Sequence, residues 1–129
     1  MKVLVTGSRE WRSRTPVLRA LLASKATVVI HGGARGADGY AKWNARALGI
    51  PEREYPADWD RYGRAAGPLR NQEMLDKEHL PEEPIDLVLA FPLEGSIGTW
   101  DMVKRAEQAG IAVKVCGPGY DAEPDLFID

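Results

Sequence analysis

The chain has 129 residues, of which 44% are hydrophobic and 28% are charged, and its formal net charge is −2. This length and composition are typical of one globular domain, so we expect a single domain over residues 1–129. No apolar run reaches the roughly 20 residues of a membrane span, and no signal-peptide pattern follows Met1, so we expect a cytoplasmic protein without a membrane partner. The single cysteine, Cys116, excludes an internal disulfide framework and a cysteine-based zinc cluster.

The charges are distributed unevenly along the chain. Residues 1–75 hold 13 of the 17 basic residues, whereas residues 76–129 hold 12 of the 19 acidic ones, including those of an acidic tail over residues 117–129. The net charge gives no bulk attraction to nucleic acid, but this asymmetry predicts a local site for an anion.

Short apolar runs alternate with helical patterns from the first residues onward. Strands are expected over residues 2–6, 26–30, 53–55, 85–91 and 111–115. Helices are expected after an N-cap at Thr15, over residues 37–48, from Pro68 onward, and over residues 102–109, and residues 57–67 read as a loop. The alternation predicts a three-layer, doubly wound α/β sandwich with a five-stranded parallel sheet in the order 3-2-1-4-5. A ligand would then bind between the first and fourth strands, outside their carboxyl ends.

Two glycine-rich loops each follow an apolar strand; we call residues 32–36 the first glycine loop and residues 92–99 the second. Glycines at a strand-to-helix turn allow a ligand to approach backbone N–H groups at the positive end of a helix, which suits phosphate. A tight turn without a ligand is the alternative. The phosphate-binding candidates here and after the first strand are Gly7, Ser8, Gly32, Gly33, Gly36, Pro92, Gly95, Ser96, Gly98 and Thr99.

Several side chains in these loops have two interpretations. Asp38 either caps the second helix or accepts a hydrogen bond from a ribose hydroxyl, and Thr99 either faces a phosphate or acts as an N-cap. His31 is either a structural histidine or a general base. Trp11 and Trp59 are candidates to stack on a nucleobase, or else they pack within a lid.

Seven arginines fall near the carboxyl edge of the predicted sheet, and guanidinium groups suit bidentate contacts with phosphate. We expect Arg9, Arg35 and Arg70 to provide the counter-charges of the ligand; the other four are Arg12, Arg14, Arg61 and Arg64. The glycine pattern of nicotinamide-binding domains and that of P-loop nucleotide triphosphatases are both missing from their expected places. We expect neither a metal nor a cofactor.

Five segments, taken in this order, resemble the YspA/cpYpsA-related branch of the SLOG superfamily of Rossmann-like nucleotide-ligand domains. The resemblance extends from residue 3 to about residue 115, and the segments are Thr6-Gly7-Ser8-Arg9 with Trp11, residues 31–38, residues 56–59, residues 66–74, and residues 90–99. It implies a domain that binds or senses a nucleotide-derived ligand.

The same superfamily includes the LONELY GUY phosphoribohydrolases, whose pattern joins Arg-Lys-x-Glu-Met to Pro-Gly-Gly-x-Gly-Thr-x-x-Glu. The segment Arg70-Asn71-Gln72-Glu73-Met74 is similar to the first part, which places Arg70 at the catalytic arginine and Asn71 in the binding segment. The position of the catalytic glutamate holds Met102, which cannot act as an acid or base. Asp101 and Glu94 are the carboxylates available to replace it.

Three functions follow from the residues and the resemblance together. The first is binding of a phosphorylated nucleotide derivative, and the second is hydrolysis of a nucleotide N-glycosidic bond. The third is binding of single-stranded nucleic acid, since the DNA-processing protein A family shares the superfamily; the overall acidity disfavours it. The resemblance also implies a homo-oligomer, expected to be a dimer.

Overall fold

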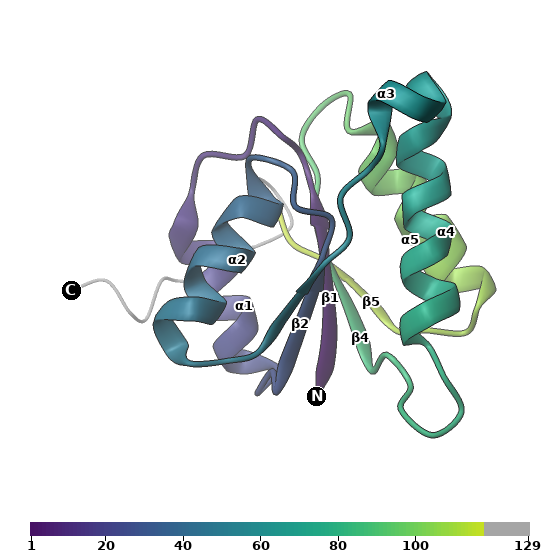
Figure 1. Ribbon diagram of the computed structural model, residues 1–129. Helices are drawn as coiled ribbons and strands as arrows, with labels where there is room; N and C mark the ends of the chain where they lie inside the picture. The colour runs from purple at the N-terminus through teal and green to yellow at the C-terminus, as the bar shows by residue number, and fades with distance from the viewer. Residues whose placement is uncertain (118–129) are drawn as a thin grey trace.

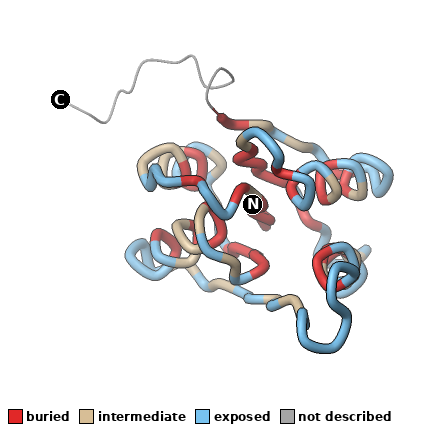
Figure 2. The backbone as a smooth tube through the Cα atoms, turned by 90° about the horizontal axis from the view of Figure 1, so that it is seen from above, coloured by how far each residue is buried: buried red, intermediate tan, exposed pale blue. Residues whose placement is uncertain are grey.

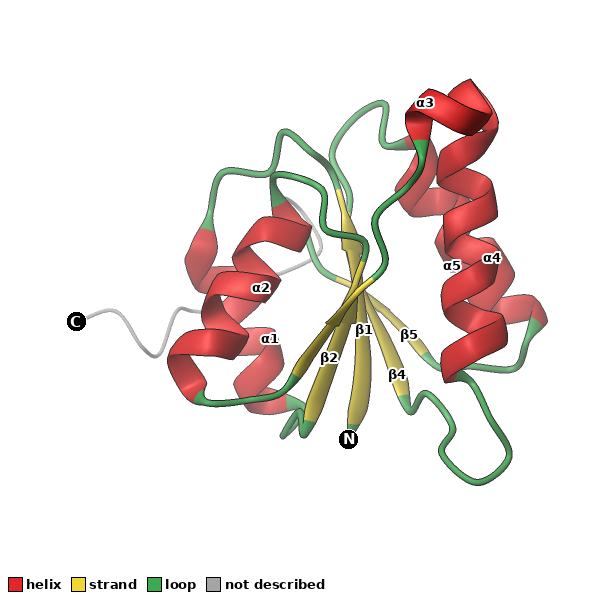
Figure 3. Ribbon diagram, viewed as in Figure 1, coloured by secondary structure: helices red, strands yellow, loops and turns green. Residues whose placement is uncertain are grey.

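The computed structural model describes residues 1–117, which form a five-stranded, all-parallel sheet in the order β3-β2-β1-β4-β5 (Figures 1 and 3). The predicted α/β fold and strand order are confirmed. The strands are β1 (Lys2–Gly7), β2 (Val28–His31), β3 (Glu52–Glu54), β4 (Leu87–Phe91) and β5 (Val113–Val115). The predicted acidic tail lies outside the described residues, except for residue 117.

The helices form two layers, one on each face of the sheet. Figure 3 shows α1 and α2 on one face and α4 and α5 on the other, so the three-layer arrangement is as expected. The helices are α1 (Arg14–Ala23), α2 (Ala37–Leu48), the short α3 (Trp59–Tyr62) with the 3₁₀ turn η1 (Gly63–Ala65), α4 (Ala66–Glu78) and α5 (Ile97–Gln108). None of these helices has both the length and the apolar character needed to cross a membrane.

The core is divided by the sheet into two apolar clusters because alternate residues of a strand point to opposite faces. Val3 and Val5 of β1 pack with α1 and α2, whereas Leu4 packs on the other side with Met74 of α4 and Met102 of α5. Figure 2 shows the buried residues along the strands and on the helix sides that face them. β4 is buried from Val88 onward, as expected for a central strand.

Several predicted boundaries were wrong. Helix α1 begins at Arg14 with Ser13 at its N-cap, so Thr15 lies inside the helix. Helix α4 begins two residues before Pro68. Pro68 is tolerated there because N–H groups in the first turn of a helix have no intrahelical acceptor, so the missing proline N–H costs no hydrogen bond. The predicted loop over residues 57–67 contains α3 and η1, because the Asp58 side chain accepts a 3.1 Å hydrogen bond from the Arg61 N–H and caps a helical turn.

The sheet topology places the candidate residues at one edge. β1 and β4 are neighbours, with Gly7 opposite Phe91 at their carboxyl ends, but the chain leaves β1 toward α1 and leaves β4 toward α5, on opposite faces. The loops therefore separate at this edge, as the upper part of Figure 1 shows. This is the switch point at which ligands bind in open α/β sheets.

Candidate functional site

Two adjoining cavities lie at the carboxyl edge of the sheet. The larger, which we call the main cavity, has a volume of about 510 Å³, and the smaller, which we call the side cavity, has about 410 Å³. Both glycine loops contribute to the main cavity, the first through Ala34 and the second through residues 94–99, and Asp38 of α2 lines it beside Ala34. The two cavities share four lining residues, which are Arg9, Ala34, Trp59 and Arg70.

The amides of the first glycine loop are already hydrogen bonded within the protein. Oδ2 of Asp38 accepts hydrogen bonds from the N–H groups of Gly32, at 3.1 Å, and Ala34, at 3.4 Å. The Gly33 N–H donates to Nδ1 of His31 at 3.0 Å. The expectation that Gly32 and Gly33 offer bare amides to a phosphate is therefore wrong for this conformation, and the loop is instead held in shape from within.

Asp38 does not cap helix α2, whose N-cap position is Gly36. Its carboxyl group is buried, and this burial raises its pKa to about 6, although Arg70 and the two loop amides favour the ionised form. Asp38 thus stabilises the first glycine loop through its hydrogen bonds with the Gly32 and Ala34 amides. Its side chain also lines the main cavity.

Arg70 is seated against the first glycine loop. Its Nη1 donates to the carbonyl oxygens of Gly32, at 2.8 Å, and Tyr55, at 3.3 Å, and its Nε donates to Oδ1 of Asn71 at 3.1 Å. Its Nη2 has no hydrogen-bond partner among residues 1–117. Burial is the main cause that lowers the pKa of Arg70, and nearby Arg9 lowers it further. A bound anion would offset both effects.

Asn71 connects Arg70 to the opposite wall of the main cavity. Besides accepting from Arg70, it donates through Nδ2 to the Gly98 carbonyl oxygen, at 3.2 Å, and to Oδ2 of Asp101, at 3.0 Å. Its side chain is buried, and both of its donor contacts are made within the protein. Asn71, which the resemblance places in the binding segment, therefore positions its neighbours on both sides of the main cavity.

Asp101 lines the main cavity as a carboxylate. Desolvation opposes its ionisation, but hydrogen bonds from Arg105 and Asn71 outweigh that effect and lower its pKa below the usual value. Glu94 lines the same cavity. Met102 is fully buried in the core beside α4, so no carboxylate stands where the phosphoribohydrolases carry theirs.

The second glycine loop leads into α5, which begins at Ile97 within that loop. Gly95 has a φ of +80°, which favours glycine, and Ser96 occupies the N-cap position, with its Oγ accepting a 2.9 Å hydrogen bond from the Leu93 N–H. Gly98 and Thr99 lie in the first turn of α5, where backbone N–H groups have no intrahelical acceptor. Thr99 is thus inside the helix and is not its N-cap.

The arginines separate into two groups. Arg9, Arg64 and Arg70 line the main cavity, and Arg35 lines the side cavity. Arg35 pairs at 2.5 Å with Glu10, an exposed residue that lines the main cavity only. Of the remaining three, Arg14 lies over the ring of Trp43 and Arg61 over that of Tyr62, and neither these two nor Arg12 lines either cavity. Arg64 was not among the ligand-binding candidates, although it belonged to the arginines of the predicted edge.

The two stacking candidates differ in their accessibility. Trp59 is 46% exposed, lines both cavities, and lies beneath the Arg9 guanidinium at 4.8 Å from its ring centroid. Trp11 is buried, makes an edge contact with Phe91 at 5.3 Å, and donates its indole N–H to the Ser13 carbonyl oxygen. The prediction that Trp11 stacks on a base is therefore wrong.

Two further candidates have structural roles. Gly36 has a φ of +75°, and a Cβ there would overlap the Ser8 carbonyl oxygen, so this glycine permits close packing of two loops. Pro92 is buried and does not line either cavity. Gly7 and Ser8 do line the main cavity. Thr6 and Pro68 also line the main cavity, although the sequence did not lead us to expect them there. The position of Thr6 at the carboxyl end of a strand could have indicated its place at the site.

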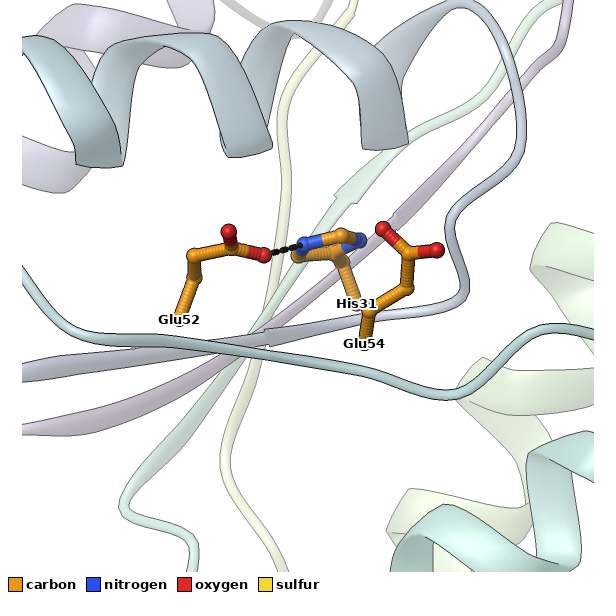
Figure 4. A group of neighbouring side chains, drawn as sticks. All are labelled: His31, Glu52 and Glu54. Atoms are coloured by element: carbon orange, nitrogen blue, oxygen red, sulfur yellow. Dashed lines mark hydrogen bonds and ion pairs between the residues drawn. The ribbon is translucent and has the colours of Figure 1, made fainter.

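His31 is part of a satisfied polar cluster beside the cavities. Figure 4 shows its ring between Glu52 and Glu54, with Nε2 lying 2.7 Å from Oε1 of Glu52. Because Nδ1 accepts from Gly33, Nε2 carries the proton and donates it to Glu52. Arg46 and Lys42 pair with Glu52 and Glu54. The ligand atoms of these three residues lie within 4.8 Å of one another. Both ring nitrogens of His31 already have hydrogen-bond partners in the protein, so in this conformation His31 has a structural role.

Comparisons with known proteins give one family and one related fold. A sequence model of the YspA, cpYpsA-related SLOG family matches residues 1–62. The gene 61 protein of Mycobacterium phage D29 is 42% identical over 122 residues, covering 87% of this chain and 93% of that protein. The X-ray structure of DNA processing protein A from Streptococcus pneumoniae aligns with a TM-score of 0.50 and 19% identity over 88% of this chain. The chain spans only 58% of that structure, and the likeness is one of fold.

Proposed function

Because this chain belongs to the YspA, cpYpsA-related SLOG family, we propose that it binds a nucleotide-derived phosphorylated ligand in the main cavity. The family and the fold are compatible with a function related to nucleotides or nucleic acids. One observation carries the proposal of a phosphorylated ligand in the main cavity. Arg70 and the first turn of α5 line this same cavity, and Asn71 is hydrogen bonded to both.

The phosphate is assigned to the α5 side of the main cavity. The N–H groups of Gly98 and Thr99 lie at the positive end of a twelve-residue helix, and this arrangement favours an anion. Arg64 and Arg70 line the same cavity and supply positive charge. The first glycine loop contributes to phosphate binding by positioning Arg70, whose guanidinium group donates to the Gly32 carbonyl oxygen, and not through its own amides.

The nucleoside part is assigned to the remaining walls. Trp59 offers a half-exposed ring on which a base can stack, at a gain of about 1–3 kcal/mol by analogy with single-strand binding sites. Asp101 and Glu94 provide carboxylate oxygens that can accept hydrogen bonds from ribose hydroxyls. A volume of about 510 Å³ is within the range of small-molecule sites.

Isothermal titration with AMP, GMP, CMP and UMP tests this proposal. We expect at least one nucleotide to bind, and Arg70→Ala to weaken its binding at least tenfold. Arg61→Ala is the matched control, because Arg61 lies over Tyr62 and lines neither cavity. Equal losses in the two variants, or no binding by any nucleotide, would contradict the proposal. A short single-stranded oligonucleotide, titrated at two salt concentrations, tests the nucleic-acid alternative.

A second candidate is hydrolysis of the N-glycosidic bond of a nucleoside monophosphate. The hydrogen-bonded series Arg70–Asn71–Asp101 favours it, since it holds a guanidinium and a carboxylate on one cavity. With its lowered pKa, Asp101 is ionised at neutral pH and would stabilise positive charge on the ribose instead of donating a proton. Release of free base from a monophosphate, lost in Asp101→Asn, tests this candidate.

The homodimer implied by the resemblance stays a prediction. Trp43, which is 55% exposed on α2 beneath Arg14, is a candidate for its interface. Sedimentation equilibrium of the wild type and of Trp43→Ala would measure the effect on association.

A further inference from the structure

We propose that the side cavity holds a second phosphoryl group, so that this chain prefers nucleotides with two phosphates over nucleoside monophosphates. The inference rests on the proposed function, because it assigns the rest of the same ligand to the main cavity. It is carried by the charges that line the side cavity, whose nine lining residues include three arginines and no carboxylate.

The three arginines reach the side cavity from different parts of the chain. Arg9 follows β1, Arg35 belongs to the first glycine loop, and Arg70 lies on α4. Arg9 and Arg70 lie near enough for their charges to repel, and this repulsion adds to burial in lowering the pKa of Arg70. Like charges held together across a cavity are stabilised by an anion between them.

The arginine contacts leave room for such an anion. Arg9 has a cation–π contact with Trp59 and no carboxylate partner among residues 1–117, and Nη2 of Arg70 has no hydrogen-bond partner there. Arg35 is paired with Glu10, but both side chains are more than 60% exposed. A pair this exposed contributes little and yields readily to a phosphate. Pro56, Ala57 and Trp59 supply the uncharged wall.

The main cavity differs in the chemistry of its walls. Its lining combines three arginines with four carboxylates, and it includes the hydroxyl side chains of Thr6, Ser8, Ser96 and Thr99. Such a mixture suits a sugar and one phosphate, whereas the side cavity suits an anion alone. Since Arg9 and Arg70 line both cavities, one ligand can extend from one into the other.

The test compares ligands with one and two phosphates. AMP, ADP and adenosine 3′,5′-bisphosphate are titrated by calorimetry into the wild-type chain and into Ala57→Glu, which introduces a carboxylate into the side cavity. Ala57 does not line the main cavity. The wild type should bind one of the two bisphosphorylated ligands at least tenfold more tightly than AMP. Which of them it prefers tells whether the second phosphate is attached to the first or to the opposite side of the ribose.

Ala57→Glu should remove that preference, because it lowers the affinity for the bisphosphorylated ligands more than the affinity for AMP; thermal melting verifies its fold. Ala57→Gln is the matched control of nearly equal volume and should keep most of the preference. Equal wild-type affinities for AMP and both bisphosphorylated ligands would overturn this inference while leaving the proposed function intact. A preference that survives in Ala57→Glu would also overturn it. If no nucleotide binds, the proposed function and this inference fail together.

Discussion

The guanidinium group of Arg70, on α4, donates a 2.8 Å hydrogen bond to the carbonyl oxygen of Gly32, which immediately follows β2. The space beside Gly32 is filled by this guanidinium group, so a Cβ at position 32 would overlap Nη1 of Arg70. The first glycine loop is therefore glycine-rich partly because an arginine from another element packs against its backbone. The sequence suggested that the first glycine loop binds phosphate through its amides; in the structure its Gly32 carbonyl oxygen instead accepts a hydrogen bond from the Arg70 guanidinium group.

Substitution of Gly32 by alanine should thus displace Arg70. We expect Gly32→Ala to weaken nucleotide binding about as much as Arg70→Ala, at least tenfold, and to lower the free energy of unfolding by about 1–2 kcal/mol through the lost hydrogen bond. Gly39→Ala is the control, since its Cβ would meet only the Ala34 carbonyl oxygen at an ordinary 3.6 Å. Calorimetry and urea unfolding measure both effects. Full binding by Gly32→Ala would contradict the role given to this contact.

Gly98→Ala separates ligand binding from stability at the second glycine loop. A Cβ at position 98 would have no atom within 4 Å, and alanine favours a helix more than glycine does, so the free energy of unfolding should rise by up to about 1 kcal/mol. The added methyl group would narrow the main cavity beside the α5 amides, and AMP binding should weaken. A stabilised variant with unchanged affinity would place the phosphate elsewhere.

Gly36→Ala should be severely destabilising. The substitution combines a φ of +75° with overlap of the new Cβ and the Ser8 backbone, and we expect a loss of about 3 kcal/mol or more. Gly49→Ala has a similar φ of +71° but open space around the Cβ, so it measures the backbone strain alone, about 1 kcal/mol. Urea unfolding of the two variants should differ accordingly. Equal losses would contradict the packing role of Gly36.

Asp38→Asn should change how stability depends on pH. Because burial raises the pKa of Asp38 from 3.8 to about 6, the folded protein binds more protons than the unfolded chain between these values. The wild type should therefore lose stability relative to Asp38→Asn as the pH rises from about 4 to 6, by up to about 3 kcal/mol. Urea unfolding at pH 4, 5, 6 and 7 measures the difference between the two proteins. A difference that does not vary with pH would contradict the assignment.

The sequence by itself determined the sheet and the edge at which the two cavities lie. Apolar strands alternating with helical patterns leave few ways to bury both faces of a parallel sheet, and the order expected among them is the one observed. The positions of Trp59 and of the second glycine loop after strands predicted that both lie at this edge, because loops after parallel strands meet at one edge of the sheet.

Only the tertiary structure decided what each side chain does there. Burial of Trp11 against Phe91, the use of the first-loop amides by Asp38 and His31, and the seat of Arg70 on Gly32 all join residues from separate elements. Local pattern carries no information about such contacts, since hydrogen bonds and burial depend on which partners the packed sheet brings within about 3–4 Å. The tertiary structure likewise decided that arginines and carboxylates together line the main cavity, whereas the charged residues lining the side cavity are all arginines.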